Sequence, residues 1–215
     1  MNIRALLEAI LDAILPRRER RRRTEKRAMS DIPLSPGSHQ LLGTDILTVL
    51  DYREPAVEDL LQSLKYDASG HAALLCAELL EDFLREELSS FRAFSTKRIL
   101  LVPVPLHTER LQERGFNQIE MILERLPSEF KNGRIASISP TLLRTRPTKQ
   151  QTHLSREERL RNVAGAFELS DADSLRDAHI VLIDDVTTTG ATLAEASRPF
   201  VRHGIPMTLL ALARA

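Results

Sequence analysis

The chain has 215 residues, of which 42% are hydrophobic and 28% charged, an ordinary composition for a globular protein with one main domain and an appendage. Its 30 basic and 30 acidic residues give a formal net charge of zero, which does not support a nucleic-acid-binding surface over the whole protein. Cys76 is the only cysteine, which excludes an intrachain disulfide and a cysteine-cluster metal site and favours a reducing, cytoplasmic setting. No apolar run reaches the length of a transmembrane helix, and the N-terminus lacks the order of a signal peptide.

Residues 1–30 are predicted to form a helical arm. Apolar residues recur at helical spacing up to Leu15, which predicts a short amphipathic helix that ends near Pro16. The run 17–27 that follows contains eight Lys or Arg and two Glu, so it carries a formal charge of +6 against −6 for the rest. Such an arm can lie on an anionic membrane surface or contact nucleic acid; alternatively, its helix docks on its own domain or a second subunit and is followed by a solvated charge run.

Residues 31–90 form a second predicted region of one strand and two helices. Two prolines, a glycine and three serines in residues 29–39 indicate a linker between the arm and the folded body. A strand is expected over 45–52, followed by helices over 56–64 and 71–88. His71 and Cys76 are interpreted as ordinary residues of the second helix.

In the third predicted region, residues 91–215, strands alternate with helices. This order favours an α/β fold with a central, mostly parallel sheet flanked by helices. The strand over 97–102 ends at Pro103, because proline has no N–H to donate to a sheet. A helical pattern over 106–126 follows, interrupted at Gly115 and Asn117. Further strands are expected within 135–143 and 163–169, from Val181 onwards, and over 207–213.

Two groups of basic residues in this region are candidates for binding an anion. Arg110 and Arg114 are four residues apart and can share one helix face, and their guanidinium groups match the oxygens of a pyrophosphate. Taken alone, they can equally be an ordinary exposed face. The most basic part of the body includes Arg144, Arg146 and Lys149, and it can be a flap over an anionic substrate or a solvated hairpin and helix.

The most informative segment is VLIDDVTTTGATL, residues 181–193. Asp184 and Asp185 stand where a buried strand emerges from the sheet, and paired carboxylates can accept hydrogen bonds from the 2′ and 3′ hydroxyls of a ribose. A small, hydroxyl-rich turn then leads into a helix, whose free N–H groups and partial positive charge suit a phosphate. The turn consists of Thr187, Thr188, Thr189, Gly190, Ala191 and Thr192. The segment therefore predicts a ribose 5-phosphate site, the alternative being an acidic turn between a core strand and a helix.

This segment lacks the P-loop and dinucleotide fingerprints but resembles the 5-phosphoribosyl 1-pyrophosphate (PRPP) motif of type I phosphoribosyltransferases. Together with PVPLHTERLQERGFNQ and LLRTRPTKQQTHLSREERLRNVAGAF, it makes residues 47–215 similar to the competence protein F (ComF) branch of that family. The more particular marks are KY at 65–66, RGFNQ at 114–118 and RNVAGAF at 161–167. Members commonly start with a four-cysteine zinc ribbon, which has no counterpart here, so zinc is not expected.

The resemblance implies a type I phosphoribosyltransferase fold that binds PRPP with Mg²⁺ and transfers its 5-phosphoribosyl group to a nitrogen nucleophile. It implies that Asp184 and Asp185 face the ribose hydroxyls and that residues 187–192 hold the 5-phosphate. Arg110 and Arg114 would stand behind the pyrophosphate loop, and a flexible catalytic hood over 144–161 would carry the catalytic candidates Lys149, Arg144 and Arg146. A homodimer agrees with the family, and no residue identifies the acceptor.

Two other readings of the sequence stay open. The competence resemblance implies a non-catalytic protein of the same fold that uses its arm, alone or together with its basic hood, to handle single-stranded DNA or a DNA-uptake helicase. A membrane-surface or partner-docking module is the other alternative.

Overall fold

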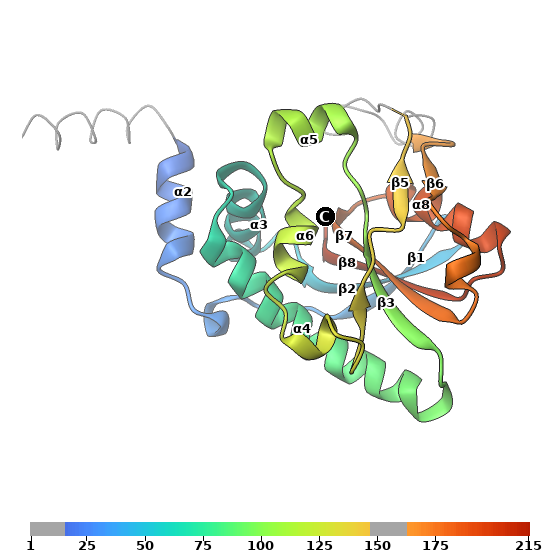
Figure 1. Ribbon diagram of the computed structural model, residues 1–215. Coiled ribbons are helices and arrows are strands. Elements are labelled where there is room, and N and C mark those ends of the chain that lie inside the picture. The colour runs from blue at the N-terminus through green and yellow to red at the C-terminus, as the bar shows by residue number, and fades with distance from the viewer. Residues whose placement is uncertain (1–15, 147–162) are drawn as a thin grey trace, which may run out of the picture.

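The computed structural model describes residues 16–146 and 163–215, and a six-stranded sheet lies at its centre (Figure 1). The strand order is β1-β2-β8-β7-β3-β4, in which β1 is antiparallel to β2 and all other neighbours are parallel. The strands are β1 (Gly37–Leu41), β2 (Thr44–Asp51), β3 (Arg98–Pro103), β4 (Ser137–Ile138), β7 (Ala178–Thr187) and β8 (Met207–Arg214). This confirms the predicted α/β class with a mostly parallel sheet.

Helices flank the sheet, and a separate hairpin stands beside it (Figure 1). The helices are α2 (Pro16–Glu25), α3 (Pro55–Asp67), α4 (Gly70–Phe94), α5 (Thr108–Arg114), α6 (Gln118–Leu123) and α8 (Ala191–Arg202). Short 3-10 turns are η1 (Met29–Asp31), η2 (Ser128–Phe130) and η4 (Asp173–Leu175). The hairpin pairs β5 (Leu142–Arg144) with β6 (Phe167–Leu169), and β6 contacts α8. In the part of the chain that the structure describes, no helix combines the length and apolarity needed to cross a bilayer.

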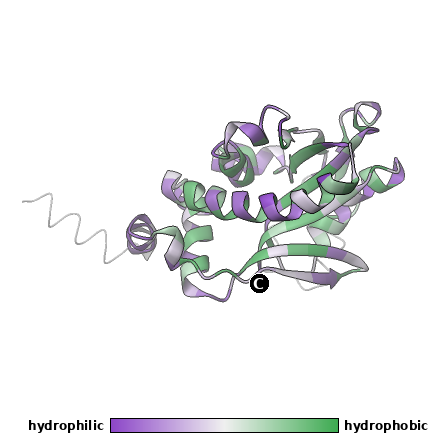
Figure 2. Ribbon diagram, turned by 90° about the horizontal axis from the view of Figure 1, so that it is seen from below, coloured by the Kyte–Doolittle hydropathy of each residue, from purple (hydrophilic) through white to green (hydrophobic). Residues whose placement is uncertain are grey.

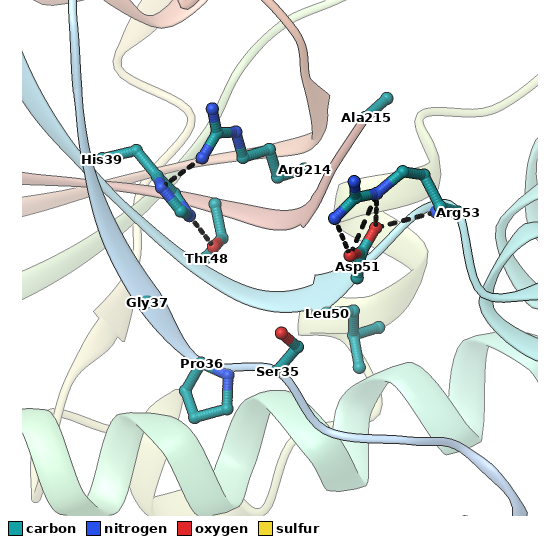
Figure 3. A pocket seen from close by; sticks show the side chains of 10 residues that line it. All are labelled: Ser35, Pro36, Gly37, His39, Thr48, Leu50, Asp51, Arg53, Arg214 and Ala215. Atoms are coloured by element: carbon teal, nitrogen blue, oxygen red, sulfur yellow. Dashed lines mark hydrogen bonds and ion pairs between the residues drawn. The ribbon is translucent and has the colours of Figure 1, made fainter.

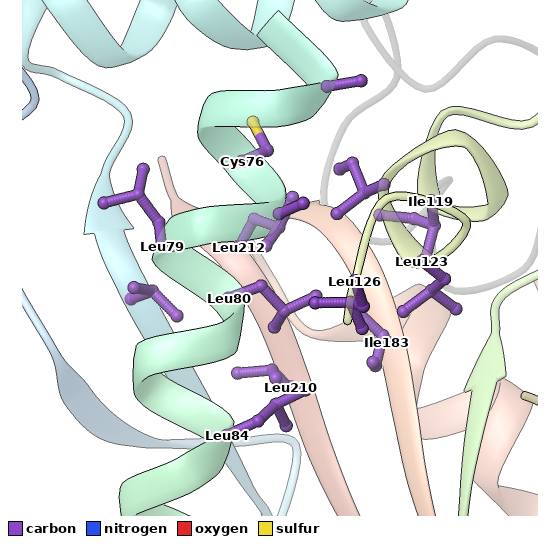
Figure 4. Close-up of a cluster of buried hydrophobic side chains, with 14 of the residues drawn as sticks. Cys76, Leu79, Leu80, Leu84, Ile119, Leu123, Leu126, Ile183, Leu210 and Leu212 are labelled. Carbon is purple, nitrogen blue, oxygen red and sulfur yellow. The ribbon is translucent and has the colours of Figure 1, made fainter. Parts of the chain in front are cut away.

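One face of the sheet is covered by α3, α4 and α6. The apolar stripe of α4, with Leu80 and Leu84, packs against Ile183 of β7 and Leu210 and Leu212 of β8 (Figure 4). Burial of each such side chain contributes roughly 1.5–3 kcal/mol to folding. This packing fixes β7 and β8, and therefore the acidic segment at the end of β7, relative to the helices.

The other face is covered by α8 and the β5–β6 hairpin. Phe200 of α8 is fully buried, and Leu193 and Ala196 belong to the same cluster as Leu182 of β7 and Phe167 of β6. Figure 2 shows the strands as mainly hydrophobic and α2 as hydrophilic. The sheet is thus buried on both sides, as a parallel sheet with helices on its faces requires.

Most predicted elements are present, with two differences in extent. The end of the predicted linker forms β1, an edge strand whose residues alternate between partly buried and exposed. Because none of its side chains is fully buried, the strand consists largely of small and polar residues, as a loop does. The helical pattern over 106–126 is two helices. Gly115, with φ of 82°, ends α5 in the left-handed conformation, and Asn117 caps α6 by accepting a hydrogen bond from the N–H of Ile119.

The arginine run, predicted as a solvated charge run with no assigned secondary structure, forms helix α2 in the described part of the chain, where Arg21, Arg22 and Arg23 are exposed. Arginine is a good helix former, and pairs such as Arg21 with Glu25, four residues apart, support the helix. The amphipathic helix predicted before Pro16 lies outside the described residues.

The described part of the arm docks on its own domain through α2 and the residues that follow it. Arg23 donates to both carboxylate oxygens of Asp59 at 2.8 Å, and Arg27 donates to the same group at 3.1 Å. Arg20 pairs with Asp67 at 2.9 Å, and the buried Thr24 hydroxyl lies 3.0 Å from that of Ser63. These contacts join α2 to α3 through charge pairs and little apolar area.

Candidate functional site

Both candidate aspartates lie on β7 near the carboxyl ends of the parallel strands. The strand continues beyond them to Thr187, which is opposite Arg214 of β8, so the aspartates still belong to the sheet. Successive side chains of a strand point to opposite faces. Asp185 accordingly meets residues of α3 and α6, while Asp184 feels the charge of Arg144 in the β5–β6 hairpin.

Asp185 is held by donors from three elements. The side-chain amide of Gln118 donates to Oδ2 at 2.8 Å, and the N–H of Val186 donates to Oδ1 at 2.7 Å. The Nζ of Lys65 is 3.8 Å from Oδ2. These donors orient the carboxylate of Asp185.

Asp184 has the opposite surroundings. Its Oδ1 accepts a hydrogen bond from the N–H of Asp185 at 2.9 Å. Burial, and secondly the charge of Asp185, raise the pKa of Asp184 to about 7, against smaller opposing effects of Lys65 and Arg144. With a pKa of about 7, Asp184 is about half protonated at neutral pH, which lowers the negative charge of the acidic pair.

Three arginines gather close to this acidic pair. Arg110 and Arg114 lie on α5 and Arg144 ends β5; we call them the site arginines. Burial and then the neighbouring Arg114 lower the pKa of Arg110, while burial and then Arg110 lower the pKa of Arg144 to about 10. The mutual repulsion of these groups would be relieved by an anion with several charges.

Two of the site arginines, Arg110 and Arg114, form no ion pair within the described residues. Arg114 donates from Nη1 to the neutral amide oxygen of Gln118 at 2.8 Å. Within residues 16–146 and 163–215, Arg110 forms no hydrogen bond or ion pair. Arg144 lies over the ring of Phe167, with its guanidinium carbon 5.2 Å from the ring centre.

The predicted phosphate turn joins β7 to α8. Thr187 is buried at the end of the strand, Thr188 is exposed, and Thr189 Oγ1 lies 3.4 Å from the N–H of Ala191. Gly190 precedes α8 with φ of 80° and offers no side-chain cap to the first turn of the helix, where Thr192 also lies. The backbone N–H groups of this turn are therefore suited to a phosphate.

Gly190 also fits a space that no other residue could occupy unchanged. A Cβ at this position would lie 2.7 Å from the Cβ of Leu41 in β1 and 3.1 Å from Cδ1 of Ile46 in β2. The turn is therefore seated directly on the β1–β2 hairpin, and this contact sets its position.

Lys65 and Tyr66 at the end of α3 are next to the site but were not assigned a role from the sequence. The ring of Tyr66 is 46% exposed. It has cationic groups of Arg20, Lys65 and Arg114 at 6.0, 5.9 and 5.9 Å from its centre. This Tyr66 cluster connects α2 with α5, and its only signal in the sequence was the KY pair.

The RGFNQ segment links the loop after β3 to the acidic pair. Gly115 ends α5, which allows the chain to turn back toward the sheet. The Asn117 side chain donates to the carbonyl of Val104 at 3.2 Å, and Gln118 holds both Arg114 and Asp185. Sequence reasoning assigned a role to Arg114 but not to Gln118, because the contact with β7 arises only from tertiary packing.

The RNVAGAF segment is described from Val163 onwards, and it anchors the hairpin on α8. The N–H of Gly165, whose φ is 64°, donates to Oε1 of the buried Glu195 at 2.6 Å. Phe167 then supports Arg144. Arg146 is exposed at the edge of the described part, and the predicted Lys149 lies outside it, as does most of the predicted hood.

Two cavities lie away from these residues. One of about 320 Å³ opens at the carboxyl ends of β2 and β8, where Arg214 donates to Nδ1 of His39 at 2.6 Å (Figure 3). A shallower one of about 480 Å³ includes Thr44 of β2 and Val201 of α8. None of the predicted site residues lines either cavity.

The sequence was compared with known proteins. No family model matches it. DNA utilization protein YhgH of Salmonella typhimurium is 34% identical over 160 residues, which cover 74% of this chain and 66% of that protein. Competence protein ComFC of Bacillus subtilis is 34% identical over 131 residues, which cover 60% of this chain and 49% of the relative. Competence protein F of Haemophilus influenzae is 32% identical over 117 residues, which cover 54% and 50%.

The matched regions thus span from about half to 66% of the relatives' own length. They agree with the resemblance drawn from the motifs and with the mostly parallel α/β sheet expected of a type I phosphoribosyltransferase fold. From these matches, the chain belongs to the ComF family.

Proposed function

We propose that this protein binds PRPP and transfers its 5-phosphoribosyl group to a nitrogen nucleophile with release of pyrophosphate. One observation carries the proposal: an acidic pair and three arginines, of which Arg110 and Arg114 form no ion pair within the described residues, occur together at the carboxyl ends of β7 and β3. Ligands of open α/β sheets bind beyond the carboxyl ends of the strands. A compound with a diol, a 5-phosphate and a pyrophosphate matches this distribution of charge.

Each part of the ligand has a counterpart in the chain. The carboxylates of Asp184 and Asp185 would accept hydrogen bonds from the ribose hydroxyls, and the turn 187–192 would hold the 5-phosphate. Arg110, Arg114 and Arg144 would face the pyrophosphate, whose charge they neutralise. The proton on Asp184 reduces the repulsion between the acidic pair and the anion.

In the reaction, the bond between C1 of the ribose and the pyrophosphate oxygen breaks as the nitrogen nucleophile approaches C1. Positive charge develops on the ring while negative charge collects on the leaving group. The site arginines would stabilise the leaving group, and the two aspartates would orient the ring through its hydroxyls. Arg146 and Lys149 stay candidates for contacts with the reacting groups.

Magnesium would enter together with the ligand. Among the residues that the structure describes, no group of three or more His, Cys, Asp or Glu side chains could hold a metal ion. The pyrophosphate oxygens, which suit this hard cation, would therefore supply most of its coordination. Bound Mg²⁺ would add charge neutralisation of the leaving group.

The test is isothermal titration of PRPP with Mg²⁺ into the protein and into a variant carrying Asp184→Asn and Asp185→Asn. We expect saturable binding by the unchanged protein and a loss of at least about tenfold in affinity for the variant, since two charge-assisted hydrogen bonds are weakened. No saturable binding by the unchanged protein would end the proposal. Activity would then be sought with a panel of bases and amines as acceptors.

A second candidate function is supported by the Tyr66 cluster. Single-stranded nucleic acid is bound without sequence preference by exposed aromatic rings next to cations, and Tyr66 offers such a ring beside Arg20, Lys65 and Arg114. The printed names of the relatives concern DNA utilization and competence. A helicase partner and a homodimer are further proposals in this reading.

Fluorescence anisotropy with a labelled oligonucleotide tests the DNA reading. If it is correct, Tyr66→Ala weakens binding by about 1–3 kcal/mol, and affinity falls steeply with salt. Unchanged affinity in Tyr66→Ala would remove the ring from the site. Deletion of residues 1–30 separately asks whether the arm contributes.

A further inference from the structure

Gln118 hydrogen-bonds through its side chain both to a site arginine and to the acidic pair. It is the first residue of α6 and only 4% exposed. Its Oε1 accepts from Arg114 at 2.8 Å, and its Nε2 donates to Oδ2 of Asp185 at 2.8 Å. An arginine can only donate and a carboxylate can only accept, so the orientation of the amide is determined by its two partners.

Asp185 and Arg114 belong to the two halves of the proposed ligand site. Asp185 is assigned to the ribose and Arg114 to the pyrophosphate. Both contacts of Gln118 involve a charged partner, and such hydrogen bonds are shorter and stronger than neutral ones. Each contact also polarises the amide in the direction that strengthens the other.

The residues next to Gln118 are held by a helix cap, a hydrogen bond and packing in the core. Asn117, just before it, caps α6 and is tied to the carbonyl of Val104, while Ile119 and Ile122 are buried in the core below α4. Arg114 and Asp185 are each partly exposed, so without a ligand their side chains keep more freedom than the buried amide between them. A ligand that fixes one of these two groups therefore also fixes the amide, which lowers the entropy that must be lost when the other group is fixed.

We propose that Gln118 is a positioning residue that couples the two halves of the site, so that binding of pyrophosphate at the arginines favours binding of the ribose phosphate at the acidic pair, and the reverse. This inference rests on the proposed function. It assigns to the RGFNQ segment a role beyond the single charge of Arg114. The coupling is reciprocal, because each ligand changes the affinity for the other by the same factor.

The experiment uses the two halves of PRPP as separate probes. Magnesium pyrophosphate is titrated into the full chain by calorimetry, with and without saturating ribose 5-phosphate, and the reverse titration is then made. We expect each probe to tighten binding of the other by about fivefold or more. Independent binding of the two probes would overturn the coupling and leave the proposed function standing, whereas failure of both probes and of PRPP to bind would end both.

Two substitutions test whether Gln118 carries the coupling. Gln118→Leu keeps a similar volume and removes both hydrogen bonds, so the cooperativity should fall to about onefold while each probe still binds. Gln112→Leu, on the exposed side of α5, is the matched control and should keep the coupling. Retained coupling in a folded Gln118→Leu protein, as judged by its thermal unfolding, would contradict the assignment.

Gln118→Glu separates positioning from a merely structural role. At neutral pH the new carboxylate can still accept from Arg114 but repels Asp185, so the coupling should be lost. At lower pH, a protonated Glu can donate to Asp185 as the amide does, and the coupling should return. Coupling that is equally strong at every pH in this variant would overturn the proposal.

Discussion

Two groups of arginines in this protein differ in what faces them. The docking arginines, Arg20, Arg23 and Arg27 of the arm, face Asp59 and Asp67 on α3. The site arginines, Arg110, Arg114 and Arg144, meet one another, an amide and the ring of Phe167. Within the described residues, Arg20, Arg23 and Arg27 have their charge balanced by close ion pairs with carboxylates, whereas Arg110 and Arg114 form no such pair.

Under the proposed function, this difference separates arginines that stabilise the fold from arginines that bind the ligand. Where the fold places a carboxylate beside an arginine, the ion pair joins the arm to α3 and neutralises the arginine's charge. Where the fold gathers cations that repel one another at the end of a sheet, it leaves their charge for a ligand, at a cost in stability. Part of the basic run that the sequence suggested for contact with a membrane surface or nucleic acid is therefore bound to carboxylates of its own domain.

The largest expected effect comes from removing a site arginine. Arg110→Gln should weaken PRPP binding by about 100-fold or more. A charge-assisted hydrogen bond to phosphate is worth about 1.5–3 kcal/mol, and the substitution also removes a positive charge that attracts the pyrophosphate. The free energy of unfolding should stay equal or rise slightly, because the partial burial of an unpaired charge is relieved. Calorimetric titration and denaturant unfolding measure the two quantities. A strongly destabilised variant would place Arg110 with the docking arginines.

The second prediction concerns how the stability of the protein depends on pH through Asp184. With its pKa raised to about 7, Asp184 binds more protons in the folded than in the unfolded state between pH 3.8 and about 7, so its contribution lowers stability as pH rises through this window. Asp184→Asn should therefore be more stable than the unchanged protein at pH 8, by roughly 1–3 kcal/mol, and similar at pH 4. Urea unfolding at both pH values checks this, and equal curves at pH 8 would mean that burial of Asp184 carries no penalty.

A smaller effect is expected where the arginines are paired. Asp59→Asn leaves Arg23 and Arg27 without their carboxylate and should destabilise the protein by roughly 1–2 kcal/mol, with PRPP affinity unchanged within about twofold. The arginines lower the pKa of Asp59, so its contribution is present above the ordinary pKa of 3.8 and is lost as pH falls through its lower folded value. A large loss of PRPP affinity would show that the arm acts on the site through the Tyr66 cluster.

The sequence was sufficient for the elements whose pattern is local. The buried strands around Ile183 and Leu210 and the helices that cover them follow from apolar periodicity, and the acidic pair from its place after such a strand. Strand β1 could not be predicted, because a half-exposed edge strand has the composition of a loop. The helicity of the arginine run was missed because its docking surface on α3 is not visible in the run itself.

The same distinction applies to the candidate site. Arg110 and Arg114 could be selected from their spacing, but Gln118 could not, because its role depends on the approach of α6 to β7, 67 residues away in sequence. Lys65 and Tyr66 come from a third region and meet the site only through the packing of α3. Residues that bind through charge are visible in a sequence, whereas those that orient other residues become visible only in the fold.

The central claim is that the acidic pair and the site arginines hold two parts of one ligand. A crystal structure of the protein soaked with PRPP and Mg²⁺ tests it most directly. The account predicts the ribose hydroxyls within hydrogen-bond distance of Asp184 and Asp185, the pyrophosphate against Arg110 and Arg114, and the 5-phosphate at the start of α8. PRPP bound elsewhere, for instance in the cavity beside His39 and Arg214, would contradict the account.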